Sequence, residues 1–534
     1  MSDKFTFHAS NDPEVLKSMF TLCGSEWSGK LTPEEFGVRE AQRHLNFQKE
    51  GTIIHGYYLE DPSTKTIVAS TMVRRVDGFY KGADRSNAIS SLPDPSLIGV
   101  KNTKFLLISF VFTHKDYRKK GLAQRVVSGA IEATENKIIE EKLEKSTDSK
   151  DSFKNMVYTD GKVDKQLANY YLSKEYFWFL YSGVDKFYEK FGFKDFPLDF
   201  YRIPTSIASN AQEKLLETLL DQTKNTETFG KKLKLLKSSD KKDQDLIHFI
   251  FQGKELEILT ELNMSIFHSE LQGNQKSSSS LTSMSNILQM TQSGSNNALS
   301  SITEMSNLPT NEGKGQRRKS SVHHATIPKV ALKPVYNNYS KVSGEVPKLP
   351  ENEFSDIQGA ILTNELQQKS HYIVWNSLMR GRLFIIGMGE LKFEALTPGN
   401  VLGAAPPRRR TSSFTGINEL GGYNFQDWDI LISLADYVAK KRKIFDSDAV
   451  YISVNDVPST VPAPVLNDYF LNYLPSTFES VGSQDDEKYS EVDRVKFISD
   501  ASGELGVLPM LKLFGRTTPD FDLDWISSSM TTWG

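Results

Sequence analysis

Several features that define other classes of protein are missing from this 534-residue sequence. It has a single cysteine, Cys23, which excludes an intrachain disulfide or a thiolate zinc site and favours a reducing compartment. The formal net charge of −3 excludes a strongly basic nucleic-acid coat and an acidic tail protein. Every apolar run is shorter than the ~20 residues that cross a bilayer. The start, MSDKFTFHAS, lacks the apolar core of a secretory signal. We therefore expect a soluble cytoplasmic or nuclear protein without nucleic-acid or membrane partners.

Residues 1–204 alternate between helical and strand patterns, which is typical of an α/β domain. Asp12-Pro13-Glu14 and Thr32-Pro33-Glu34-Glu35 are helix-start signals. The almost wholly apolar run FLLISFVFT predicts a strand covered on both faces, at the centre of a mixed, mostly antiparallel sheet. Further along we predict a helix from about Gly121 to Lys145, a polar loop over 146–168, a strand over 176–181, a short helix over 185–190 and a last strand over 200–203.

The rest of the chain divides by composition. Residues 205–272 are interpreted as a helical connector, and their lysine-rich patch from Lys231 to Lys242 as a solvated helix face or loop. Between 274 and 321, 13 of 48 residues are serine and none is aromatic, which predicts a disordered insertion over 273–325. Residues 326–534 are predicted to form an α+β accessory domain. It contains a hairpin at Arg380-Gly381, a flexible segment over 401–424, a helix from Asp427 and a strand over 449–454.

The most informative stretch is SFVFTHKDYRKKGLAQRVVSGA, residues 109–130. A buried strand ends at Thr113, a short turn carries Arg118-Lys119-Lys120-Gly121, and an amphipathic helix begins there. Unpaired N–H groups and the positive end of a helix dipole make such a turn an anion site, and glycine allows close approach of a phosphate. The expected ligand group is a pyrophosphate. Neither GxxxxGK[ST] nor GxGxxG is present, so a P-loop or Rossmann site is not predicted.

A second stretch, Phe177 to Phe193, reads as strand, short helix, glycine and strand. Together the two stretches resemble the Gcn5-related N-acetyltransferase (GNAT) superfamily. Arg118, Gly121 and Ala123 match that family's Arg/Gln-x-x-Gly-x-Gly/Ala pattern after its fourth strand. The family's Tyr-Glu-Lys-x-Gly-Phe run after its fifth strand is matched at Tyr188, Glu189, Lys190, Gly192 and Phe193. The resemblance implies an acetyltransferase domain over 1–204 with acetyl-CoA as cosubstrate and no metal.

The resemblance also implies roles for particular residues. The backbone of Phe112 and Thr113 is expected to pair with the pantetheine arm of acetyl-CoA, where the fourth and fifth strands separate. Tyr188 is expected to protonate the departing CoA thiolate; alternatively it is a packing residue. Tyr181 stands where the family often has an asparagine that contacts pantetheine. The pyrophosphate is expected on backbone amides of Arg118, Lys119, Lys120, Gly121, Leu122, Ala123 and Gln124.

The general base is not identified by the sequence. The middle of the predicted fourth strand is Ile108-Ser109-Phe110, so the glutamate that some family members carry there is absent. His114, Glu60 and His55 are candidates, and a water relay is an equal alternative. For each of these three residues a surface or structural role is favoured over a catalytic one.

The acceptor is predicted from a looser resemblance to fungal lysine N6-acetyltransferases of lysine catabolism. The features that carry it are the Leu180-Tyr181-Ser182-Gly183 entry to the Tyr188 helix, the Phe191-Gly192-Phe193 exit and a large C-terminal region around Trp428. Free L-lysine is then the acceptor. A protein or peptide acetyltransferase acting on lysine or N-terminal amines, or an inactive acetyl-CoA sensor, are the alternatives.

Two further expectations concern the C-terminal half of the chain. Residues 326–534 form either a degenerate second GNAT-like half, with no second cofactor, or an unrelated lid. Arg-Arg-x-Ser motifs at Arg317–Ser320 and Arg409–Ser412 predict a basophilic kinase acting on Ser320 and Ser412; a solubilising role for these basic loops is the alternative.

Overall fold

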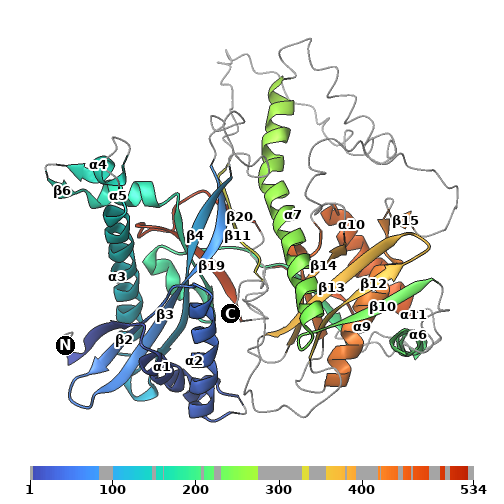
Figure 1. The fold of residues 1–534 in the computed structure, drawn as a ribbon, viewed down its shortest axis with the longest axis horizontal. Helices are drawn as coiled ribbons and strands as arrows, with labels where there is room; N and C mark the ends of the chain where they lie inside the picture. The colour runs from blue at the N-terminus through green and yellow to red at the C-terminus, as the bar shows by residue number, and fades with distance from the viewer. Residues whose placement is uncertain are drawn as a thin grey trace, which may run out of the picture.

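A computed structural model describes residues 4–29, 31–82, 100–146, 152–159, 161–205, 210–221, 230–274, 327–335, 356–378, 382–391, 419–420, 423–442, 449–458, 461–479, 494–499 and 506–526. The expected Ser-rich insertion beyond Asn274, most of the expected flexible segment over 401–424, and the two serines proposed for phosphorylation lie outside these residues. Figure 1 shows two bodies of sheet and helix with helix α7 (Lys241–Asn274) standing between them.

The first sheet contains the strands predicted from the N-terminal sequence. Its main path runs in the order β1-β2-β3-β4-β7-β19-β8, and β11 adds to β3 and pairs with β20. The bounds are β1 Thr6–Ser10, β2 Ile54–Asp61, β3 Thr66–Lys81, β4 Val100–Thr113, β7 Tyr176–Ser182, β8 Lys194–Asp195, β11 Lys329–Leu332, β19 Leu508–Leu513 and β20 Asp524–Ile526.

Three helices cover this sheet and begin where the sequence predicts. Asp12 caps α1 (Pro13–Trp27), and Thr32 with Glu35 forms a capping box on α2 (Pro33–Lys49). Helix α3 (Leu122–Glu144) begins after Gly121. The two faces of β4 bury alternate residues: Leu106 and Ile108 pack in the cluster of α3, whereas Phe105 and Leu107 pack with β11 and the segment that leads to β20. The prediction of a central strand covered on both faces is confirmed.

The second sheet has the order β10-β12-β13-β14-β17-β9-β18. In both paths the fourth and fifth strands are parallel, with α3 or α9 in the connection, and the other neighbouring strands are antiparallel. The second sheet therefore repeats the topology of the first, as the prediction of a degenerate second half requires, but not within the predicted bounds 326–534: β9 and β10 precede residue 326, and β11, β19 and β20 join the first sheet. The bounds are β9 Phe200–Pro204, β10 Lys231–Lys237, β12 Ile357–Asn364, β13 Lys369–Leu378, β14 Arg382–Glu390, α9 Gln426–Arg442, β17 Ala449–Ser453 and β18 Lys496–Ile498.

The two halves exchange a strand with each other. β9 lies between β17 and β18 of the second sheet, and β19, from near the other end of the chain, lies between β7 and β8 of the first. A domain boundary at residue 204 therefore does not divide the chain into two segments that each form one complete sheet. Local patterns of hydrophobicity identify a strand but not the sheet that it joins, which is why the sequence placed β9 in the N-terminal unit.

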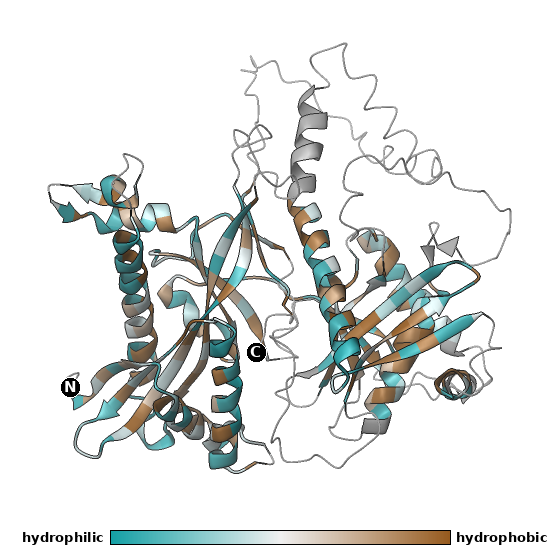
Figure 2. Ribbon diagram, in the orientation of Figure 1, coloured by the Kyte–Doolittle hydropathy of each residue, from teal (hydrophilic) through white to brown (hydrophobic). Residues whose placement is uncertain are grey.

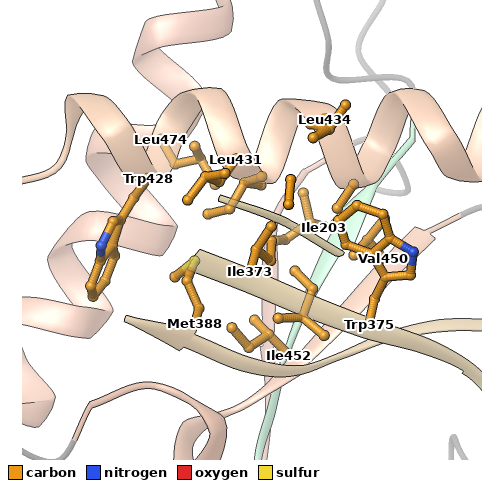
Figure 3. Close-up of a cluster of buried hydrophobic side chains, with 14 of the residues drawn as sticks. Ile203, Ile373, Trp375, Met388, Trp428, Leu431, Leu434, Val450, Ile452 and Leu474 are labelled. Carbon is orange, nitrogen blue, oxygen red and sulfur yellow. The ribbon is translucent and has the colours of Figure 1, made fainter. Parts of the chain in front are cut away.

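The largest apolar cluster lies under α9 (Figure 3). Trp428, Leu431 and Leu434 of α9 pack on strand residues that include Ile203 of the exchanged β9 and Val450 of β17. Apolar residues of α7 pack against the second sheet near its start and against β3, β4 and β11 further along; Figure 2 shows both apolar and polar residues along it. α7 therefore joins the two halves.

Two sequence interpretations are wrong. The first part of the lysine-rich patch, residues 231–237, is not a helix face or loop but the edge strand β10, because Leu233 and Leu236 are buried against α6 (Asn210–Leu220) and α7 while Lys232, Lys234 and Lys237 are exposed. The polar stretch 146–168 is not a loop throughout. Its described part contains α4 Phe153–Val157, β5 Tyr158–Thr159, β6 Lys162–Val163 and the start of α5 Lys165–Leu172.

A buried ion pair fixes the exchanged strand β19 to α3. Lys512 Nζ lies 2.9 Å from Glu135 Oε1, and both side chains are buried. The same oxygen accepts hydrogen bonds from Trp178 Nε1 at 2.9 Å and from the Gly515 amide at 3.0 Å. One carboxylate thus holds together α3, β7 and the C-terminal strand.

A pH effect on stability is expected from Asp429 in α9. Burial raises the pKa of this carboxyl to about 6, although it accepts a 2.9 Å hydrogen bond from Tyr469. Because the folded protein favours the protonated form, this contribution to stability is full below about pH 4 and is lost as pH rises through 6. Asp429→Asn should match wild type at pH 4 and exceed its free energy of unfolding by on the order of 2 kcal/mol at pH 7.5.

Urea denaturation at a series of pH values would measure the difference, with exposed Asp520→Asn as the control for losing one charge. A wild-type minus Asp429→Asn difference that stays constant from pH 4 to 7.5 would contradict the expectation.

Candidate active site

The parallel strands β4 and β7 separate partway along their length. Their backbones pair from Lys104 opposite Tyr176 to Leu107 opposite Phe179, where the pairing ends. Beyond that point the β3–β4 register shifts, and Phe110 has a φ of 52°. A bulge of this kind bends a strand away from its neighbour. The separation of the fourth and fifth strands expected from the resemblance is therefore present.

Phe112 and Thr113 lie beyond the bulge and pair with Ser70 and Ala69 of β3. Their other edge faces the space from which β7 has diverged. The Thr113 carbonyl accepts a hydrogen bond from Arg118 Nε at 3.2 Å. Thr113 Oγ1 is buried and has no hydrogen-bonding partner within the described residues.

The N-terminus of α3 is open. Gly121 is its N-cap, with a φ of 74° and no side-chain cap, so the first amides of the helix have no capping partner. Lys119 also has a positive φ, of 61°. Backbone N–H groups around left-handed turn residues form anion-binding concavities, and here the turn is exposed to solvent. The turn from Lys119 to Gly121 and the uncapped start of α3 thus have the backbone geometry of such a concavity, whereas the Arg118 amide already donates to the Lys115 carbonyl at 3.4 Å.

Two of the three cations in this turn already have contacts. Arg118 is paired with Glu26 at the end of α1, and its guanidinium lies 5.5 Å from the Phe112 ring. Lys120 Nζ donates to the Asp116 carbonyl at 3.2 Å. Arg118 therefore helps to hold the turn onto α1. The sequence carries no signal for Glu26, because 92 residues separate the two partners.

Tyr188 lies close to the separation of β4 and β7, in a segment that contacts the N-terminus of α3. It belongs to the short 3₁₀ segment η5 (Asp185–Phe191) that follows β7, and Lys190 of that segment donates to Gln124 Oε1 at 3.3 Å. Tyr188 shares an apolar cluster with Ile108 and Leu180, the first residues of β4 and β7 beyond their paired segment. The structure thus brings together the two stretches that carry the resemblance.

The Tyr188 side chain is buried, with 6% of its surface exposed. The rings of Phe187 and Phe193 lie 5.0 and 6.1 Å away. Burial raises the pKa of its hydroxyl well above the ordinary value, so the phenol stays protonated at neutral pH. A protonated phenol can donate a proton, but the raised pKa makes it a weaker acid, so the same burial also fits the alternative of a packing residue.

The three candidate bases lie at different places. His55 lies 3.0 Å from Lys137, which is 15 residues along α3 from Leu122 and hence about 22 Å from the open N-terminus. His114 follows β4 directly, and its Nδ1 accepts a hydrogen bond from the Asp116 amide at 3.3 Å. Glu60 pairs with Lys65 at the end of β2 that lies nearer to His114. Position therefore disfavours His55; His114 lies at the end of β4, and Glu60 lies at the same end of the sheet but two strands away, on β2.

Three other side chains of the N-terminal half bear on the site in different ways. Cys23 is fully buried, and burial raises the pKa of its thiol to about 12, so it is not a nucleophile at neutral pH. Trp27 is half exposed, and its ring lies 5.3 Å from that of Phe112. Tyr181, where an asparagine is frequent in the family, packs 6.3 Å from the Trp525 ring. The sequence did not single out Trp27, because nothing local distinguishes it from a core tryptophan.

Within the part of the chain that the structure describes, no group of three or more His, Cys, Asp or Glu side chains could hold a metal ion. A search of the same residues finds no helix long and apolar enough to cross a membrane.

The chain matches no known family in a scan of protein families, and no curated protein is similar to it in sequence. Solved structures are similar to it. A probable N-acyltransferase from Enterococcus faecalis has 10% identity and a TM-score of 0.37, with 95% of this chain and 73% of that chain covered. A GCN5-related N-acetyltransferase from Kribbella flavida has 9% identity and a TM-score of 0.35, over 96% and 72% of the two chains.

A third similar structure is the N-myristoyltransferase of Saccharomyces cerevisiae with bound myristoyl-CoA and inhibitors, at 10% identity and a TM-score of 0.34, covering 97% of this chain and 82% of that chain. With identities near 10% and TM-scores below 0.5, the interpretation of the site depends on this chain's own residues.

Proposed function

We propose that this protein is an acyl-CoA-dependent N-acetyltransferase that transfers the acetyl group of acetyl-CoA to a primary amine. The observation that carries the proposal is the open N-terminus of α3 beside the separation of β4 and β7. A pyrophosphate fits the exposed turn from Lys119 to Gly121 together with the uncapped first amides of α3. An extended pantetheine arm fits the free edge of Phe112 and Thr113, where a neighbouring strand is missing.

In the proposed reaction the amine nitrogen attacks the thioester carbonyl carbon. A C–N bond forms, the C–S bond breaks, and the nitrogen loses a proton to a base or to water. The departing thiolate takes a proton from Tyr188, which lies next to the strand separation and is protonated at neutral pH. His114 or Glu60, or a water held by them, is the proposed base.

For the acceptor we propose the N6 amine of free L-lysine; the support for this choice is the sequence resemblance to fungal lysine N6-acetyltransferases. Incubation of the protein with acetyl-CoA and free lysine, other amino acids or a lysine-peptide mixture, with thiol release as the readout, tests it. Turnover with lysine supports the proposal. Turnover with peptides alone would replace the acceptor, and binding of acetyl-CoA without any turnover would indicate a sensor.

Charge reversal in the turn before α3 tests the pyrophosphate site. Lys119→Glu with Lys120→Glu should raise KM for acetyl-CoA at least about tenfold, or ~1.4 kcal/mol, while kcat at saturation changes little. The reason is that two carboxylates would then face the phosphates. Initial rates at a fixed acceptor concentration measure this.

The matched control reverses two exposed lysines near the other end of α3, Lys162→Glu and Lys165→Glu, and should leave KM unchanged. Equal increases in KM for both pairs would point to overall charge and against a local phosphate site.

A further inference from the structure

The C-terminal half has its own counterpart of the groove between β4 and β7. β14 and β17 pair in parallel, with Leu383 to Ile385 opposite Val450 to Ile452, and their pairing ends there. As in β4, a bulge lies just beyond, because the β13–β14 register shifts at Ile386. Helix α9 also follows β14 before the chain reaches the parallel partner strand, although the short strands β15 (Glu419–Leu420) and β16 (Tyr423–Asn424) come between β14 and α9, whereas a single turn separates β4 from α3. The same two ligand-binding elements, a strand separation and a helix N-terminus, therefore recur.

In this half a lysine side chain occupies the strand separation. Lys254 Nζ, from α7, donates a 2.8 Å hydrogen bond to the Ile386 carbonyl on β14. The same Nζ is paired with Asp456, which lies in the turn η9 (Val454–Asp456) directly after β17. Both side chains are buried. The ammonium group thus bridges the two diverging strands and takes the β14 carbonyl that an incoming amide would use.

A carboxylate occupies the N-terminus of α9. Asp427, in its first turn, is 1% exposed. Lys231 Nζ lies 2.8 Å from its Oδ1, and His371 Nδ1 lies 3.1 Å from its Oδ2. The Asn364 side-chain amide approaches both oxygens at 3.4–3.5 Å. Burial raises the pKa of Asp427, but its contacts with His371 and Lys231 outweigh that and hold it at about 2, so the anion persists.

The N-terminal half differs at both places. The first turn of α3 contains no acidic residue, and its N-cap Gly121 is exposed. A buried charge is costly unless it is paired. In the C-terminal half both buried acids have a lysine partner: Asp427 pairs with Lys231, and Asp456 pairs with Lys254. The two ion pairs lie at the places that correspond to the proposed phosphate and pantetheine sites of the N-terminal half.

We propose that the C-terminal half is a cosubstrate groove closed by the chain's own side chains, with Asp427 in the place of a ligand phosphate and Lys254 in the place of the pantetheine arm. This inference rests on the proposed function for the meaning of the groove. The protein then holds one acyl-CoA per chain, in the N-terminal half. The C-terminal half contributes rigidity and the exchanged strand β19.

Anion rescue tests the role of Asp427. Asp427→Ala leaves a space of carboxylate size beside Lys231 and His371, and its Tm should fall by roughly 5 °C or more. Sodium formate should restore much of the loss, whereas sodium chloride at equal ionic strength should not. Asp427→Asn is the matched control, because its amide fills the space and formate should not rescue it. Formate that acts no better than chloride on Asp427→Ala would overturn the proposal.

Two measurements on the wild-type chain apply even where Asp427→Ala does not fold. Trace labelling with acetic anhydride and mass spectrometry should modify Lys254 at least roughly tenfold more slowly than exposed Lys232 and Lys241. Titration calorimetry with CoA should give one site per chain. Labelling of Lys254 as fast as Lys232, or two CoA sites, would overturn the closed groove. If CoA did not bind at all, the proposed function would be overturned instead. The labelling rate of Lys254 and the formate rescue would then still test whether the C-terminal groove is closed.

Discussion

Tyr188→Phe is expected to lower kcat for acetyl transfer by about 100-fold, with little change in KM for acetyl-CoA. The variant removes one oxygen from a side chain packed beside the separation of β4 and β7 and leaves the ring in place. Without that proton donor the CoA thiolate must leave unprotonated or take a proton from water. Thiol release at saturating substrates measures the loss.

The matched control is Tyr176→Phe. Tyr176 belongs to the same apolar cluster but stands at the start of β7, where the strands are still paired. Its loss should leave kcat within about twofold of wild type. If Tyr188→Phe retained full activity, Tyr188 would be a packing residue, and the proton would have to come from elsewhere.

Glu135→Ala is expected to destabilise the protein by about 3–5 kcal/mol, which is a large part of the stability of a typical domain. The change leaves the ammonium of Lys512 buried without its anion, and it leaves the Trp178 N–H and the Gly515 amide without their acceptor. Because Lys512 lies on β19, loss of this pair should release the exchanged strand. Urea denaturation and limited proteolysis after residue 505 would measure both effects.

A compensating variant separates the charge from the packing. Glu135→Gln combined with Lys512→Met keeps an acceptor for Trp178 and Gly515 and removes both charges. It should recover most of the lost stability. If the double variant were as unstable as Glu135→Ala, shape and not the buried charge would account for the effect of Glu135.

Local elements of this chain were predictable because their signals are short. Asp12 and Thr32 cap helices within three residues of themselves, and Gly121 starts α3 where the apolar stripe begins. The apolar run of β4 likewise indicated a strand covered on both faces. The lysine-rich strand β10 was misread because only Leu233 and Leu236 of its seven residues are well buried, and an edge strand needs little apolar surface.

The candidate site was predicted in part for the same reason. The turn from Arg118 to Gly121 and the segment around Tyr188 each carry a local pattern, and the structure brings them together through Lys190 and Gln124. Glu26, which pairs with Arg118, has no such pattern. The position of His55, far along α3 from the open turn, also required the fold.

By itself, the sequence determined the helix caps, the central strand and the glycine turn before α3 that is proposed to bind an anion, because each depends on neighbours a few residues away. Only the tertiary structure decided which sheet each late strand joins and which groove stays open. β9 and β19 cross between halves, and Lys254 meets Asp456 across 202 residues. Such choices depend on the burial and pairing of groups far apart in the chain, and no window of sequence contains both partners.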